Sequence, residues 1–217
     1  MIIDMHVHSD VSDDGMASVE TYMKWLARLR RKYRIDGIVF TEHRLFNREA
    51  DYDALAREYD MLIFKGTEAD TDCGHVLCYG MNEKVLSQFD LKNVHLSGRD
   101  LLSAMQDAGG IGVPAHPGRR RIGLVEHLDQ GYDIGQALRA AEQLNGGSSP
   151  QENARAQQLV VERQLSGIGG SDAHFVSAVG KFMTAFKRPI RTVQDLVEQL
   201  YSGDYHPITL EDAKIQA

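Results

Sequence analysis

Nine side chains along this chain have the chemistry of metal ligands. They are six histidines and three carboxylates: His6, His8, Asp13, His43, Glu68, His75, His116, Asp172 and His174. Two pairs, His6/His8 and Asp172/His174, are separated by one residue, and on a strand such residues point to the same face. Each pair can therefore offer two ligands to one ion. This number of donors suffices for two or three divalent cations, so the leading hypothesis is hydrolysis by metal-activated water.

Short apolar segments precede most of these side chains and are expected to form strands. The expected strands cover residues 2–5, 35–41, 61–64, 75–79, 111–115, 141–145 and 167–171. Helical spacing of apolar residues predicts helices over 18–33, 48–59, 97–108, 124–128, 151–165 and 192–201, with a less clear segment over 134–140. Strands that alternate with helices predict an α/β fold with a parallel sheet.

The candidate ligands almost all stand at the C-terminal ends of the expected strands. Closed α/β barrels build their sites at these ends. Side chains from six or more strand ends meet at one centre only if the sheet closes or nearly closes. The ligand positions therefore favour a barrel over an open sheet.

The composition is that of one globular domain spanning residues 1–217. Of these residues 42% are hydrophobic and 25% are charged, which supports one substantial core. The net charge of −7 disfavours broad binding to long nucleic acid. Bound divalent ions would nevertheless make a pocket positive inside this acidic protein and attract an anionic substrate.

The sequence shows no targeting signal and has few cysteines, so we expect a cytoplasmic protein. No secretory leader precedes the first histidine pair, and no apolar run approaches membrane-spanning length, so no membrane partner is expected. Cys73 and Cys78 are the only cysteines, and we expect them to be reduced, buried side chains rather than a disulfide framework. His95, His127 and His206 lie outside any motif and are expected to have no ligand role.

Several motifs in this order resemble the polymerase and histidinol phosphatase (PHP) family. The motifs are Asp4-Met5-His6-Val7-His8-Ser9 with Ser12-Asp13, Thr41-Glu42-His43, Gly66-Thr67-Glu68, Pro114-Ala115-His116-Pro117 and Gly169-Gly170-Ser171-Asp172-Ala173-His174. The resemblance runs from residue 2 to about residue 205. It implies a distorted seven-stranded (β/α) barrel, TIM-like, that hydrolyses phosphoesters at a two- or three-metal centre.

The resemblance also implies how the ligands are shared among the ions. One ion would be held by His6, His8, Glu68 and Asp172. A second would be held by Glu68, His75 and His116, with Glu68 as the bridge, and a third by Asp13, His43 and His174. The reacting water on the metals would be held by Glu68, Asp172 and His174.

Two features of this sequence depart from the family motifs. The chain has Glu42-His43 where the family commonly has Asp-His. Asp13 is followed by Asp14, so either carboxylate could be the ligand, and Ser12-Asp13 favours Asp13. The excess of imidazole over carboxylate favours Zn, Mn or Fe over an all-magnesium site.

Arginines next to two of the ligands are candidates for binding a phosphate. Arg119, Arg120 and Arg121 follow the His116 motif, and Arg44 follows His43. Guanidinium groups bind phosphate in a bidentate manner. We expect Arg119, Arg120 and Arg44 to bind the substrate.

The leading function is hydrolysis of a small phosphate ester, either a monoester or a diester. The alternatives are a histidinol-phosphate phosphatase and a nuclease or nucleotide phosphatase that acts on short nucleic-acid ends. Cleavage of a C–N bond on the same metals stays open, because a fold hosts many chemistries. A non-catalytic metal-binding regulatory domain is disfavoured, because it predicts missing ligands and none is clearly missing.

Overall fold

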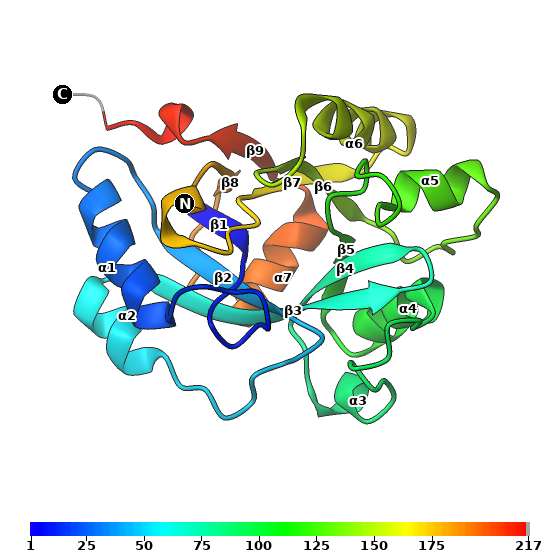
Figure 1. Cartoon of the computed structure of the whole chain (residues 1–217), viewed down its shortest axis with the longest axis horizontal. Helices are drawn as coiled ribbons and strands as arrows, with labels where there is room; N and C mark the ends of the chain where they lie inside the picture. Colours follow the sequence, from blue (N-terminus) through cyan, green and yellow to red (C-terminus); the bar gives the residue numbers. More distant parts are fainter. Residues whose placement is uncertain (216–217) are drawn as a thin grey trace.

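The computed structural model describes residues 1–215, which form two β-sheets surrounded by helices (Figure 1). The larger sheet has seven strands in the order β5-β4-β3-β2-β1-β8-β9. These strands are β1 (Ile2–Val7), β2 (Gly37–His43), β3 (Leu62–Thr71), β4 (Gly74–Tyr79), β5 (Ile111–Pro114), β8 (Phe182–Phe186) and β9 (Tyr205–Thr209). The smaller sheet pairs β6 (Ala140–Asn145) with β7 (Ser166–Gly170).

Five of the seven α-helices in residues 1–215 begin at a side chain that caps them. They are α1 (Val19–Leu29), α2 (Asp53–Tyr59), α3 (Glu83–Leu86), α4 (Gly98–Asp107), α5 (Leu124–Asp129), α6 (Pro150–Glu162) and α7 (Val193–Ser202). Ser18 caps α1, and Ser149 and Thr192 form capping boxes at α6 and α7, whereas α2 and α5 begin without a capping side chain. The expected helix over 48–59 is shorter than predicted, and the segment over 134–139 has no regular element.

The expected all-parallel sheet is wrong, because the seven-stranded sheet is mixed. Strands β1, β2 and β3 run parallel, whereas β4 is antiparallel to both β3 and β5, and β8 is antiparallel to β1 and β9. The cause at β4 is a two-residue connection, Asp72-Cys73, which allows only a hairpin. The sequence prediction ended β3 at residue 64, before this hairpin, and it did not include β8 or β9.

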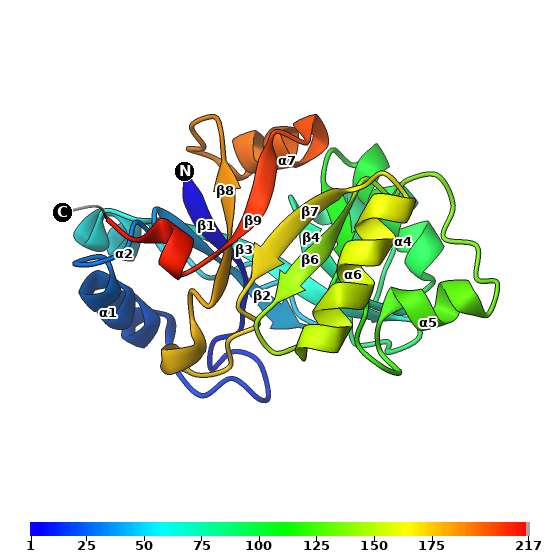
Figure 2. The same ribbon diagram turned by 90° about the horizontal axis from the view of Figure 1, so that it is seen from above.

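The seven-stranded sheet curls into a half-barrel, and the β6–β7 pair lies beside β9 (Figure 2). Within residues 1–215 no ladder of strand pairing joins β6 or β7 to the larger sheet. The expected seven-stranded barrel is therefore met only in part. The curl still brings the ends of β1, β2, β3, β6 and β7 to one place.

Strand β7 packs closely against β1 because Gly170 has no side chain and because backbone hydrogen bonds join the end of β1 to the segment that follows β7. A Cβ atom at Gly170 would lie 2.5 Å from the Cβ of His6, so only glycine allows this approach. The Asp172 N–H donates to the His6 carbonyl at 2.7 Å, and the His8 N–H donates to the Ala173 carbonyl at 3.0 Å. These contacts place the first and last ligand motifs side by side.

The core fills the curl of the sheet and its outer faces. Helix α7 lies at one end of the curled sheet (Figure 2), and its Leu196, Val197 and Leu200 join a cluster with β1 and β5 side chains. Cys73 and Cys78 are buried and free, as expected, and burial raises the pKa of the Cys78 thiol to about 12. Among residues 1–215, no helix combines the length and apolar character that crossing a membrane requires.

Candidate metal centre

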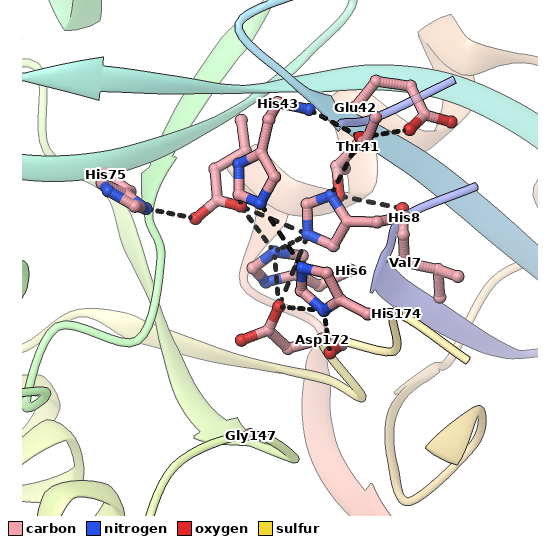
Figure 3. A network of polar contacts seen from close by, with 12 residues as sticks. His6, Val7, His8, Thr41, Glu42, His43, His75, Gly147, Asp172 and His174 are labelled. Atoms are coloured by element: carbon pink, nitrogen blue, oxygen red, sulfur yellow. Dashed lines mark hydrogen bonds and ion pairs between the residues drawn. The ribbon is translucent and has the colours of Figure 1, made fainter. Parts of the chain in front are cut away.

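Eight of the nine expected ligands come together at one end of the curled sheet (Figure 3). They form three overlapping groups in which the donor atoms lie close enough to share an ion. The groups are His6, His8, Glu68 and Asp172; Glu68, His75 and His116; and His8, His43 and His174. Most of these side chains line a cavity of about 590 Å³.

Glu68 lies at the centre of these groups, with its two oxygens turned to different histidines. Its Oε2 is 3.1 Å from His6 Nε2 and 3.3 Å from His8 Nε2. Its Oε1 is 2.8 Å from His75 Nδ1 and 2.9 Å from His116 Nε2. The side chain is fully buried. A carboxylate placed in this way can bridge two cations.

The chemistry of the donors fits a bound ion at the first group. The Nε2 atoms of His6 and His8 are only 3.0 Å apart, and both face Glu68 Oε2. The same two nitrogens lie 3.5 and 3.4 Å from Asp172 Oδ1. Two facing imidazole nitrogens share at most one proton, so a cation satisfies their lone pairs together with the two carboxylates.

The pKa values in this group show how strongly its charges depend on one another. Burial alone would lower the pKa of His6, but Glu142, Asp172 and Glu68 raise it well above its usual value. Burial would raise the pKa of Glu68, but positive His6 and hydrogen bonds from His116 hold it well below its usual range. The carboxylates thus stay ionised and available to a metal.

His43 provides a second test of fit. Its Nδ1 is buried and has no hydrogen-bond partner among the described residues, yet it lies 3.2 Å from Glu68 Oε2. Burial lowers the pKa of His43 to about 4, which favours the neutral imidazole that binds metals. A neutral His43 has one free lone pair, so it can bind one cation, either beside Glu68 through Nδ1 or beside Asp14 through Nε2.

Asp13, the ninth expected ligand, is not next to the histidines. Its side chain is 68% exposed and pairs with Arg44 at 2.7 Å. Asp14 takes that place, with its Oδ2 3.1 Å from His174 Nε2 and 3.4 Å from His43 Nε2. The tight turn that closes at Gly15 points the two neighbouring carboxylates in different directions.

Glu42 supports the turn and does not face the histidine groups. Its carboxylate accepts hydrogen bonds from the hydroxyls of Ser9 and Ser12, each at 2.5 Å. The Ser12 hydroxyl oxygen also accepts a hydrogen bond from the His43 N–H at 3.0 Å. The departure from the family's Asp-His therefore affects the loop that carries Asp14.

Two of the three arginines expected to bind substrate line the cavity. Arg119 donates from one guanidinium nitrogen to Asn145 Oδ1 and Asp172 Oδ2, each at 2.8 Å. Arg44 is paired with Asp13 and Asp70 at the rim. Arg120 is exposed and does not line the cavity.

Sequence reasoning gave no role to two buried carboxylates that support the ligands. Asp4 accepts backbone hydrogen bonds from Ser171 at 2.9 Å and Gly180 at 2.8 Å, and burial raises its pKa to about 6. Glu142 on β6 contacts His6. The signal that could have identified them was a carboxylate inside an apolar strand, because a buried charge requires partners.

The histidines expected to have no ligand role lie away from the centre. His95 and His206 are exposed and His127 is half-buried. Among residues 1–215 none of the three belongs to a group that could hold a metal ion. The two buried cysteines are also outside these groups.

Comparisons with known proteins agree with the motifs. Residues 150–205 match a family model described as PHP-associated. No curated protein matches the chain. The matched residues are about a quarter of the chain and include Asp172 and His174, so they confirm the resemblance to the PHP family in this part of the chain.

Solved structures with the same fold have low sequence identity to this chain. An amidohydrolase from Chromobacterium violaceum with bound sulfate and no metal is 18% identical, with a TM-score of 0.66 over 97% of this chain and 99% of that one. A protein from Bifidobacterium adolescentis assigned as a metal-dependent phosphoesterase is 18% identical, with a TM-score of 0.57 over 80% and 87%. The lesion-specific endonuclease Q from Pyrococcus furiosus is 14% identical, with a TM-score of 0.65 over 95% of this chain and 57% of that one.

Proposed function

We propose that the protein is a metal-dependent hydrolase that cleaves phosphate esters at a centre of two or three divalent ions. The observation that carries this proposal is the position of Glu68, whose two oxygens face separate histidine groups. Zn, Mn or Fe suits this donor set, because imidazole nitrogens are well represented in it. The resemblance to the PHP family supports the same reaction class.

In this proposal some residues bind the ions and others orient the substrate. Divalent ions supply an activated water and neutralise phosphoryl oxygens. Glu68, Asp172 and His174 would bind the ions that carry this water. Arg119 would orient an anionic group, because Asp172 and Asn145 fix its guanidinium at the cavity. Arg44 would do so from the other rim.

The third ion is proposed at His43 and His174 with Asp14. Asp14 is preferred to Asp13, because its carboxylate is within 3.4 Å of both imidazoles. His8 stacks against both of these rings, with centroids 4.2 Å from His43 and 4.4 Å from His174. The third group is therefore in direct contact with the first.

The substrate proposal is a phosphate ester small enough for the cavity of about 590 Å³. Structures of the same fold include an endonuclease and an amidohydrolase, so the preference for a small ester rests on this chain's cavity and its charge of −7. A short nucleic-acid end is the second candidate, and the likeness to the lesion-specific endonuclease Q supports the nucleic-acid part of this candidate but not the preference for an end. Histidinol phosphate and an amide complete the set of substrates to compare.

The test is restoration of activity after chelation. Protein freed of metal receives Zn²⁺, Mn²⁺ or Fe²⁺ and is assayed on p-nitrophenyl phosphate, its bis-ester, histidinol phosphate, an end-labelled oligonucleotide and an amide. We expect ester cleavage that depends on metal and is lost in Glu68→Gln. Glu198→Gln, an exposed carboxylate on α7, is the matched control. Folded, metal-loaded protein that cleaves none of the esters would contradict the proposal.

A further inference from the structure

One fully buried carboxylate touches the metal groups without belonging to any of them. Glu142 lies on β6 and its two oxygens have different partners. Its Oε1 is 3.0 Å from His6 Nδ1. Its Oε2 accepts hydrogen bonds from the His116 N–H at 2.7 Å and from Asn145 Nδ2 at 2.9 Å. His6 and His116 belong to different metal groups that share Glu68.

The contact of Glu142 with His6 favours one ring nitrogen of His6 as the one that can bind an ion. His6 directs Nε2 toward Glu68 and His8, and directs Nδ1 toward Glu142. A neutral imidazole carries its single proton on one of its two nitrogens. A carboxylate at Nδ1 favours the proton there, so the Nε2 lone pair is left for an ion.

The contact with His116 holds a backbone conformation that is otherwise costly. His116 has φ of 30°, a left-handed value that residues other than glycine rarely adopt. In this conformation its N–H donates to Glu142, and its Nε2 lies 2.9 Å from Glu68 Oε1. Removal of the acceptor would release the backbone that aims this ligand.

We propose that Glu142 is a positioning residue that couples the two metal groups joined by Glu68. It sets the tautomer of His6 in one group and fixes the backbone of His116 in the other. This inference rests on the proposed function, because it requires ions at both groups.

The isosteric variant Glu142→Gln is diagnostic because of the number of donors around this side chain. Glu142 faces three donors, from the His6 ring, the His116 backbone and the Asn145 amide. A glutamine has one oxygen, and its NH₂ group is itself a donor. In one orientation the NH₂ group opposes the His116 N–H and the Asn145 amide. In the other it donates to His6 Nδ1, which moves the ring proton to Nε2 and removes the lone pair that faces the ion site.

The experiment titrates Co²⁺ into metal-free protein, follows the visible absorption of the bound ion, and measures Zn²⁺ affinity by competition with a chelator. The proteins are wild type, Glu142→Gln and the control Glu198→Gln. We expect Glu142→Gln to bind both ions of the Glu68 pair at least about 10-fold more weakly, with altered Co²⁺ spectra. Control and wild-type affinities should agree.

Melting of the metal-free proteins separates positioning from a structural role. A purely structural role predicts a lower melting temperature without metal and unchanged affinities, and that result would overturn the inference. If Glu142→Gln does not fold, Glu142→Asp replaces it, because the shorter carboxylate cannot reach both partners. Wild-type affinity in that variant would also overturn the inference. Failure of the wild type to bind any ion would instead refute the proposed function, and this inference with it.

Discussion

The two metal groups that share Glu68 differ from the third group in burial and in the elements that carry them. His6 and Glu68 are fully buried on β1 and β3, and the side chains of His116 and Asp172 are 2% and 4% exposed, whereas His75 is 20% exposed. In the third group the side chains of His174 and Asp14 are 28% and 51% exposed. Asp14 also lies in a turn and not at a strand end. For the proposed three-ion centre, we therefore expect two preorganised sites around Glu68 and one exchangeable site.

The backbone shows the same difference. His116 and Asp172 both adopt left-handed φ values, 30° and 52°. Hydrogen bonds from their N–H groups to Glu142 and to the His6 carbonyl hold these conformations. Strain of this kind persists only where the surroundings fix it. The pair of sites around Glu68 is therefore supported before any ion binds.

The largest effect is expected from Glu68→Gln. The amide keeps the shape of the side chain but replaces one of the two bridging oxygens by an NH₂ group, so both buried sites lose affinity. We expect each ion to bind more than about 100-fold more weakly, a larger loss than changes around a ligand produce. Competition with a chelator measures this, and Glu198→Gln is the control. Unchanged affinity for both ions would contradict the proposal that Glu68 bridges them.

Gly170→Ala tests whether the approach of β7 to β1 builds the buried sites. The new methyl group would lie 2.5 Å from His6 Cβ, so the strands must separate. We expect a loss of about 3 kcal/mol in the free energy of unfolding of the metal-free protein. Denaturant titration measures it.

Gly131→Ala is the comparison for backbone strain alone. Gly131 has φ of 88° and no atom within 4 Å of an added Cβ. Its substitution should cost about 1 kcal/mol, because only the left-handed backbone penalises it. Equal losses in the two variants would show that the close approach at Gly170 is not important.

Asp14→Asn against Asp13→Asn tests the exposed group. Asp14 lies within 3.4 Å of His43 and His174, whereas Asp13 pairs with Arg44. Removal of the Asp14 charge should weaken only the third ion, by about 10-fold. Asp13→Asn should leave all affinities within about 2-fold, because the pair with Arg44 is at the surface. Stepwise metal titration distinguishes the ions, and the reverse order would restore Asp13 as the ligand.

Arg119→Ala against Arg120→Ala tests substrate binding in the same way. Arg119 is tied to Asp172 at the cavity, and Arg120 is exposed outside it. We expect KM for a phosphate ester to rise about 10-fold in Arg119→Ala, the effect of losing a hydrogen bond to a charged group. In Arg120→Ala it should change less than about 2-fold. Steady-state kinetics give both values, and a larger effect at Arg120 would contradict the assignment.

Most of the candidate ligands could be predicted from the sequence because they stand in local patterns. His6/His8 and Asp172/His174 are pairs at strand ends, and the structure brings them together. The antiparallel strands of the mixed sheet could not be predicted from local sequence patterns. The reversal after Thr71 follows ten strand residues without a proline, and the turn Asp72-Cys73 has no strong signature before Gly74.

The supporting contacts depend on packing between distant segments. Glu142 reaches His6 across 136 residues of sequence, so its position in an apolar strand indicates that it needs a partner but not which residue the partner is. Asp13 and Asp14 are equivalent in type, and only the turn geometry decides which one faces the histidines. Local sequence motifs therefore identified the candidate metal ligands, whereas the residues that support them are determined by the fold.

The most direct test of the account is a count of bound ions with their positions. Crystals of protein loaded with Zn²⁺ and then dialysed without chelator are measured by anomalous scattering. We predict two ions that flank Glu68, with partial or no occupancy at His43, His174 and Asp14. An ion only at the exposed group, or no ion beside Glu68, would contradict the central claim.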